Sequence, residues 1–104
     1  MTIRSASDLA GMQRVGRLVA RTLATMRAAV RPGTTTAAID DVGARFARRE
    51  GARSAPQLTY DFPGFSCISV NDQIVHGIPG TRVVRACDVV KLDVTLELVG
   101  PSQN

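Results

Sequence analysis

The sequence has 104 residues, of which 44% are apolar and 21% charged. These proportions allow one small core and exclude a wholly disordered chain. No stretch approaches the roughly 20 consecutive apolar residues that cross a bilayer, and arginines interrupt the first apolar pattern, so neither a membrane span nor a signal peptide is predicted. We therefore expect a soluble, cytoplasmic protein whose two cysteines, Cys67 and Cys87, are reduced thiols.

The charge is distributed unevenly between the two halves of the chain. Thirteen basic and nine acidic residues give a net charge of +4. Residues 1–53 hold ten basic and four acidic residues, a net of +6, whereas residues 54–104 hold three and five, a net of −2. Twelve of the thirteen basic residues are arginines, which suit phosphate contacts. The first half has a single aromatic residue, Phe46, and no recognisable nucleic-acid-binding motif, so a solvated helical face is favoured over an RNA-binding surface.

The first predicted element is a long amphipathic helix. Its start is expected between Ser5 and Ser7, where the sequence resembles a capping box, and Pro32-Gly33 ends it. Apolar residues recur along it every three or four positions, which defines one buried stripe. The stripe consists of Leu9, Met12, Val15, Val19, Leu23, Met26 and Val30.

A second, shorter helix is predicted directly after the first. Thr34, Thr35 and Thr36 are candidate N-caps, and Gly51 lies at the expected C-terminal end. The apolar face of this helix is predicted to consist of Ile39, Val42 and Phe46.

Beyond Gly51 the apolar period changes towards two, which is typical of strands. Residues 65–70 are predicted as a strand that turns at Asn71-Asp72 and returns through residues 73–76 as a hairpin, followed by a loop over residues 77–80. The last strand is the clearest, because apolar side chains alternate with polar ones over residues 89–98. One face carries Val90, Leu92, Val94, Leu96 and Leu98, and the other carries Val89, Lys91, Asp93, Thr95 and Glu97. The order predicts one α+β domain over residues 1–104, helical and basic over 1–53 and strand-rich over 54–104.

Two residues in the second half are candidates for chemistry. His76 is the only histidine and lies directly before Gly-Ile-Pro-Gly, although a lone histidine is more often a surface or structural residue. Asp93 is a carboxylate within a predicted strand, where it is unfavourable unless it pairs, binds a ligand or faces solvent beside Lys91. One carboxylate alone does not make a metal site.

These two residues lie in segments that carry a family resemblance. The segments are Cys67-Ile-Ser-Val-Asn-Asp-Gln-Ile-Val-His-Gly-Ile-Pro79 and Asp88-Val-Val-Lys-Leu-Asp-Val-Thr95. They resemble type I methionine aminopeptidase, a family of the creatinase-like "pita-bread" metallopeptidases. Val30-Arg-Pro-Gly-Thr34 also fits the start of that family, so the resemblance covers nearly the whole chain. It implies the N-terminal portion of the pita-bread fold, two helices followed by antiparallel strands, with the second half missing.

The resemblance also implies roles for individual residues. Asp93 matches the first of five metal ligands. His76 matches the catalytic histidine that hydrogen-bonds the substrate near the scissile amide. Tyr60, Phe62 and Cys67 lie where the family lines the pocket for the methionine side chain, which should be apolar and soft.

The implied reaction is hydrolysis assisted by two divalent ions (cobalt, manganese, iron or zinc), which activate a bridging water and remove methionine from the N-termini of nascent polypeptides. After Leu98 the sequence departs from the family, and the other four metal ligands are absent. We therefore expect a truncated chain that is inactive alone and that self-associates through exposed strands. The alternatives are an active aminopeptidase, a non-catalytic fragment or pseudoenzyme, and an arginine-rich module that contacts ribosomal RNA with an affinity that falls steeply with salt.

Overall fold

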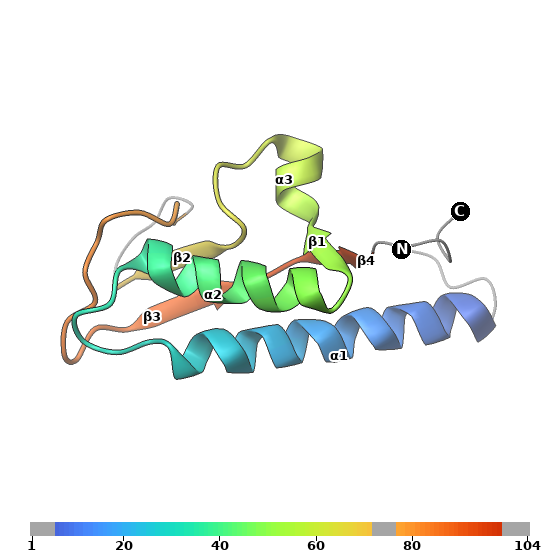
Figure 1. Ribbon diagram of the computed structural model, residues 1–104, viewed down its shortest axis with the longest axis horizontal. Helices are drawn as coiled ribbons and strands as arrows, with labels where there is room; N and C mark the ends of the chain where they lie inside the picture. Colours follow the sequence, from blue (N-terminus) through green and yellow to red (C-terminus); the bar gives the residue numbers. More distant parts are fainter. Residues whose placement is uncertain (1–5, 72–76, 99–104) are drawn as a thin grey trace.

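The computed structural model describes residues 6–71 and 77–98 (Figure 1). Two long helices lie side by side and cover two small antiparallel sheets. No helix in the described ranges is long and apolar enough to cross a membrane. The elements, in chain order, are α1 (Ala6–Ala28), α2 (Thr36–Arg49), β1 (Ala52–Ser54), α3 (Ala55–Tyr60), β2 (Cys67–Val70), β3 (Val90–Asp93) and β4 (Leu96–Leu98).

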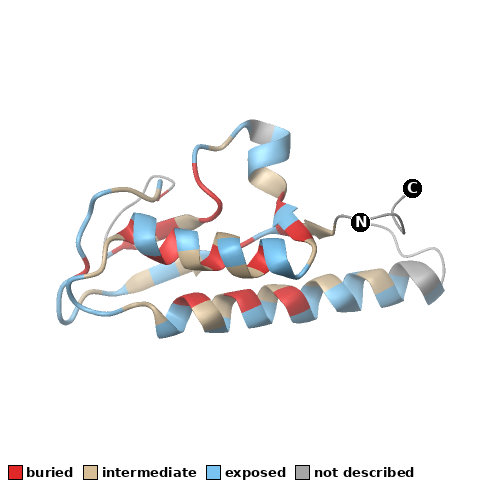
Figure 2. Cartoon of the chain, viewed as in Figure 1, coloured by how far each residue is buried: buried red, intermediate tan, exposed pale blue. Residues whose placement is uncertain are grey.

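Helix α1 begins and ends close to the predicted positions, but its buried stripe is shifted. Among the helix residues whose burial is described, Leu18, Thr22 and Met26 are buried. The buried side of α1 faces α2 (Figure 2). Leu9 and Met12 of the predicted stripe are exposed. The reason is length, since α1 has 23 residues against 14 in α2, and its first turns extend past the shorter helix (Figure 1).

Helix α2 is capped as predicted, by Thr35, whose hydroxyl accepts a hydrogen bond from the Ala38 backbone N–H at 3.1 Å. Gly51 lies just beyond its C-terminal end with a φ of 80°, a conformation that glycine adopts readily. The buried face is centred differently from the prediction, because small residues allow α1 to approach closely. The buried residues are Thr36, Ile39, Asp40, Gly43 and Ala47, whereas Val42 and Phe46 are half-buried.

The strands form two sheets of two strands each. β2 pairs with β3, and β1 pairs with β4, both antiparallel. The predicted alternation over residues 89–98 is confirmed, since Val94 and Leu96 are buried towards the helices while Lys91, Asp93 and Thr95 are exposed. The predicted single strand is divided at Val94–Thr95, because its two parts pair with different strands.

Two elements were not expected from the sequence pattern. β1 falls at the end of the half predicted to be helical, and α3 lies within the half predicted to be strand-rich. Both are short, with three and six residues, so neither shows a clear period. The predicted returning arm of the hairpin, residues 73–76, lies outside the described residues. Within the described part of the chain, β2 takes β3 as its strand partner.

Candidate functional site

The exposed face of the β2–β3 sheet brings two of the predicted site residues together. Cys67 on β2 is the register partner of Asp93 on β3. Directly opposed residues of an antiparallel pair project to the same face, with Cβ atoms about 5 Å apart. Asp93 is exposed and Cys67 is half-buried, whereas the neighbouring Ile68 is buried on the opposite face towards the helices. The sheet therefore presents a carboxylate beside a thiol on its open side.

The surroundings of Cys67 favour the neutral thiol. Burial raises the pKa of the Cys67 thiol above its ordinary value, and the negative charges of Asp93 and Asp40 raise it further. The thiolate, not the thiol, is the metal-binding and nucleophilic form of cysteine. At neutral pH Cys67 therefore provides a soft, uncharged surface beside Asp93. Both cysteines of the chain are free.

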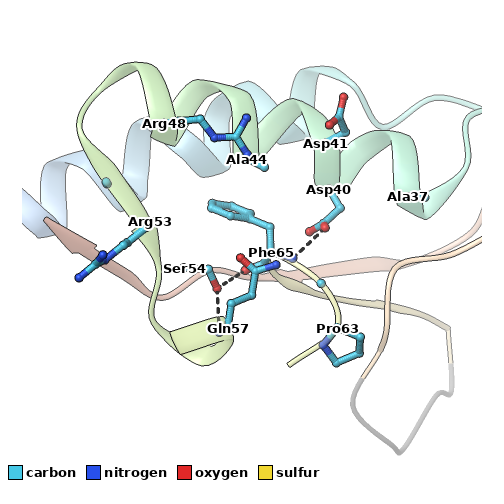
Figure 3. A pocket seen from close by; sticks show the side chains of 12 residues that line it. Ala37, Asp40, Asp41, Ala44, Arg48, Arg53, Ser54, Gln57, Pro63 and Phe65 are labelled. Carbon is cyan, nitrogen blue, oxygen red and sulfur yellow. Dashed lines mark hydrogen bonds between the residues drawn. The ribbon is translucent and has the colours of Figure 1, made fainter. Parts of the chain in front are cut away.

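A buried carboxylate from α2 holds the segment that leads into β2 (Figure 3). One oxygen of Asp40, Oδ2, accepts the backbone N–H of Phe65 at 2.9 Å. The other, Oδ1, accepts the backbone N–H of Ser66 at 2.8 Å and its hydroxyl at 2.5 Å. On the other side, the Ser54 hydroxyl donates to the Phe65 carbonyl at 2.8 Å. Because these groups are engaged by side chains, the predicted strand over residues 65–70 begins only at Cys67.

The Gly-Ile-Pro-Gly segment is fixed at both of its ends. At one end the Gly77 carbonyl accepts the N–H of Ile68 at 2.8 Å. At the other, the Gly80 carbonyl accepts the N–H of Ala37 at 2.9 Å, and the Gly80 N–H donates to the Thr36 hydroxyl at 2.9 Å. One free N–H group of the first turn of α2, that of Ala37, is satisfied in this way. Helix α2 thus positions both the segment before β2 and the Gly77–Gly80 segment.

The remaining predicted site residues are placed as follows. Phe62 is half-buried just after α3, and its backbone N–H donates to the Pro56 carbonyl at 3.3 Å. Tyr60 is the last residue of α3, and its side chain is not among those described. His76 lies outside the described residues. Hydrogen bonds and strand pairing of the described residues join Cys67 to Asp93 and do not join Phe62 to either.

The sequence reasoning missed Asp40, although a signal for it exists. Asp40 shares the spacing of the buried positions Thr36, Gly43 and Ala47 on α2. A carboxylate in such a register is costly unless its oxygens accept hydrogen bonds. An acidic residue on the buried stripe of a helix therefore indicates a partner with free N–H groups, here Phe65 and Ser66.

Comparison with known proteins identifies the family of the chain. Residues 10–100, well over half of the sequence, match the profile described as Metallopeptidase family M24. The chain belongs to metallopeptidase family M24. Methionine aminopeptidase 2 of Bacillus subtilis (strain 168) is 40% identical over 101 residues, which cover 96% of this chain and 41% of that protein. The methionine aminopeptidase of Staphylococcus epidermidis (strain ATCC 12228 / FDA PCI 1200) is 39% identical over 95 residues, 91% of this chain and 38% of that one.

A solved structure gives the same assignment for the fold of this M24 chain. The crystal structure of methionine aminopeptidase from Rickettsia prowazekii matches with a TM-score of 0.86 at 34% identity, and the match covers 94% of this chain and 40% of that one. The expected resemblance to methionine aminopeptidases and the expected order of helices and antiparallel strands are confirmed. The chain spans about two fifths of the length of the relatives it matches.

Family M24 consists of metallopeptidases, so divalent metal use is a property of the family. The described residues of this chain do not by themselves fit a dinuclear metal centre. Among residues 6–71 and 77–98 there is no group of three or more His, Cys, Asp or Glu side chains that could hold a metal ion. Asp93 offers carboxylate oxygens, but its neighbour Cys67 is held as a thiol. The described residues therefore contribute at most a part of such a centre.

Two of the pockets on the described surface lie away from the Cys67–Asp93 pair. One, of about 260 Å³, opens between α2 and the β1–α3 connection (Figure 3). Asp40 and Phe65 line it, together with Arg48, Ser54 and Gln57. The other, of about 330 Å³, lies between the end of α1 and the helix-facing side of β3. Neither is lined by Phe62, Cys67 or Asp93, so both hollows are separate from these three residues of the predicted site.

Proposed function

We propose that this chain forms the N-terminal part of a cytoplasmic methionine aminopeptidase, which removes the first methionine from nascent polypeptides. The observation that carries the proposal is the pairing of Asp93 with Cys67 on the exposed face of β2–β3. This pair lies in a chain that matches a methionine aminopeptidase structure with a TM-score of 0.86. The proposal places a hard oxygen ligand beside a soft, uncharged surface. A metallopeptidase that acts on methionine needs both of these features.

In this proposal each candidate residue has one role. Asp93 is a metal ligand. His76 hydrogen-bonds the substrate near the scissile amide and acts as the catalytic histidine. Phe62, Cys67 and Tyr60 line the pocket for the methionine side chain. The half-buried state of Phe62 and Cys67 supports this role, since a pocket wall needs apolar surface that a ligand can still reach.

The metal ions of the proposed enzyme are two divalent ions, cobalt, manganese, iron or zinc. When bound, such ions activate water and polarise the substrate carbonyl. Asp93 would hold these ions through its one carboxylate. The described residues offer no complete set of metal ligands, so the further ligands would come from outside them. We therefore propose that the 104 residues alone bind the ions weakly and do not hydrolyse the peptide.

The test compares the chain alone with a completed protein. Residues 1–98 are joined to the part of Bacillus subtilis methionine aminopeptidase 2 that follows the counterpart of Leu98 in that relative. With each metal in turn, the chain alone should release no methionine from Met-Ala-Ser, and the completed protein should release it. Asp93→Asn in the completed protein should lower kcat/KM by at least about 100-fold, since losing a ligand should cost no less than losing the group that orients one.

The matched control is Glu97→Gln, which changes another carboxylate of the exposed strand face. Glu97 pairs with Arg53 at 3.1 Å on the surface, so its loss should leave kcat/KM within about twofold. Hydrolysis by the chain alone would refute the requirement for further ligands. A completed protein that is folded by circular dichroism but inactive, or an Asp93→Asn variant with full activity, would refute the proposed function.

Contact with the ribosome through the basic helices stays a prediction. Arg14, Arg17 and Arg27 of α1 are exposed, and none of the ion pairs between described residues involves them. Arg21 instead pairs with Glu50 and lies over the Phe46 ring at 5.3 Å from its centroid. The positive charge of Arg21 is therefore engaged in contacts within the fold, whereas Arg14, Arg17 and Arg27 are the arginines of α1 that this prediction relies on.

A further inference from the structure

We infer that Asp40 is a positioning residue that fixes Cys67 in the proposed methionine pocket by clamping the Phe65–Ser66 segment to α2. The inference rests on the proposed function for the role of Cys67, while the clamp itself rests on the contacts of the described residues. Asp40 lies 27 positions before Cys67 and is not part of either resemblance segment.

The first step is the saturation of the Asp40 carboxylate. Asp40 is 9% exposed, and its two oxygens accept three hydrogen bonds, all from Phe65 and Ser66. None of the ion pairs between described residues involves Asp40. Two backbone N–H groups and a hydroxyl therefore stabilise its negative charge, through charge-assisted hydrogen bonds to the carboxylate. These bonds join the middle of α2 to one short stretch of chain.

The second step is that Phe65 is held from two sides. Its N–H goes to Asp40 on α2, and its carbonyl accepts the Ser54 hydroxyl from the end of β1. Ser54 Oγ also accepts the Gln57 N–H at 3.4 Å at the start of α3. Phe65 is itself buried in the core, at 5% exposure. Helix α2 and strand β1 thus both bond to the residue that lies two positions before Cys67, and α3 is joined to it only through Ser54.

The third step links the clamp to the candidate site. Cys67 follows Ser66 directly, begins β2 and is in register with Asp93. Ser66 is buried and Cys67 is half-buried, so the chain passes from the clamp to the open face within one residue. A shift of Phe65–Ser66 would therefore move the Cys67 side chain relative to Asp93. The later bonds of β2, such as that of Ile68 to Gly77, would stay in place.

The test uses the full chain with Cys87→Ser, so that Cys67 is the only thiol. Asp40→Asn replaces two acceptor oxygens by one oxygen and an NH₂ group, so at least one of the Phe65 and Ser66 N–H groups loses its acceptor. We expect that amide to exchange with deuterium about tenfold faster, and the Cys67 thiolate to react with iodoacetamide about tenfold faster. The thiolate rate constant is taken from a pH–rate profile, because loss of the Asp40 charge by itself lowers the pKa of Cys67 and raises the rate at a fixed pH. Asp41→Asn is the matched control, because Asp41 is exposed and pairs only with Arg45 at 2.8 Å. It should change both rates by less than about twofold.

A merely structural role would give a different result. Loss of overall stability would raise exchange at core amides such as Ile39 together with Phe65 and Ser66, and the Cys67 rate would rise steeply with urea. The inference requires faster exchange confined to Phe65–Ser66 and a Cys67 rate that is insensitive to low urea. Unchanged rates, or rates that rise in step with the core, would overturn it.

A second measurement needs no variant and decides the case if Asp40→Asn does not fold. In the unaltered chain, the Phe65 and Ser66 amides lie outside any strand, yet they should exchange as slowly as those of β2. If they exchange as fast as the amides of the exposed residues Ala86 and Cys87, the clamp does not exist. Both readouts are independent of peptide hydrolysis. An inactive completed protein would therefore refute the proposed function and leave the clamp intact. Fast exchange at Phe65 and Ser66 would refute the clamp and leave the proposed function intact.

Discussion

Gly77 lies so close to β2 that no side chain fits at its position. A Cβ atom built there would meet the Ile68 carbonyl and would lie 2.8 Å from the Ser69 backbone nitrogen. Backbone atoms in a paired strand cannot move aside as the end of a flexible side chain can. Gly77→Ala should therefore destabilise the fold by about 3 kcal/mol, the upper end of the usual cost of overpacking. The measurement is the urea midpoint by circular dichroism.

Gly16 provides the matched control for this prediction. It lies in the exposed part of α1, and nothing lies within 4 Å of the position of an added Cβ. Gly16→Ala should stabilise the chain by about 1 kcal/mol, because alanine has the higher helix propensity. The two substitutions are chemically identical and should have opposite signs. Equal midpoints for Gly77→Ala and the unaltered chain would contradict the close approach.

Single residues were predicted from the sequence where a short-range pattern carries the information. The polar strand face that carries Asp93 followed from alternation alone, and the structure adds its register with Cys67. The site roles of both residues stay predictions. Asp40 was missed because its partners, Phe65 and Ser66, lie about 25 positions later, and local periodicity contains no information on such pairings. The same limit applied to Ser54, which reaches the Phe65 carbonyl across 11 positions.

At the scale of elements, a polar clasp joins the end of β2 to the start of β3. The Asn71 N–H donates to the Val89 carbonyl at 2.7 Å, and the Val89 N–H donates to the Asn71 side chain at 2.9 Å. Asp88 Oδ1 accepts the Asn71 amide at 3.0 Å, and Asp88 Oδ2 accepts the Arg85 N–H at 2.8 Å. The clasp closes the β2–β3 ladder at Asn71. The hairpin turn predicted at Asn71-Asp72 extends into residues that lie outside the described ones.

The clasp makes a specific contribution to acid sensitivity. The hydrogen bond from the Arg85 N–H, and then that from Asn71, hold the pKa of Asp88 below its usual value of 3.8. A carboxyl with a depressed folded pKa stabilises the fold above its unfolded pKa and loses that contribution as pH falls through the folded value. Asp88→Asn should therefore make the free energy of unfolding fall less steeply below about pH 4 than in the unaltered chain. Urea titrations at several pH values measure this slope.

Asn71→Ala is the companion to this variant, because it keeps the Asp88 carboxylate and removes one of its two main donors. Its acid slope should lie between those of Asp88→Asn and the unaltered chain. An Asp88→Asn variant that loses as much stability on acidification as the unaltered chain would show that the clasp carries no charge-dependent stability.

Element prediction succeeded for long periodic segments and failed for short ones. The two predicted helices are 23 and 14 residues long. The threonines before α2 also predicted its N-cap, which is Thr35. β1 and α3 were missed because strands of three residues and helices of six owe their existence to partners, here β4 and the Ser54 cap. The division of residues 90–98 into β3 and β4 has the same origin, since only the pairing partners change at Val94–Thr95.

At the scale of the whole molecule, the described chain leaves apolar surface uncovered. Its sheets have two strands each, and such pairs are marginally stable without further packing. The exposed large apolar residues are Leu9, Met12, Leu58, Ile78, Val83 and Val89.

This surface predicts self-association of the 104-residue chain. Val89 is the most exposed of these residues, at 61%, and it adjoins β3, whose one strand partner among the described residues is β2. We therefore expect the other edge of β3 to pair with another chain. Sedimentation velocity should show species larger than the 11.1 kDa monomer that grow with concentration. Val89→Glu should shift the distribution towards monomer, because a charge at a strand contact must be desolvated. Leu9→Glu, at the opposite end of the molecule on α1, should leave the distribution unchanged. A monomer that melts in one sharp transition would contradict the prediction of self-association. Equal effects of the two variants would show that the contact between chains does not lie at the strands.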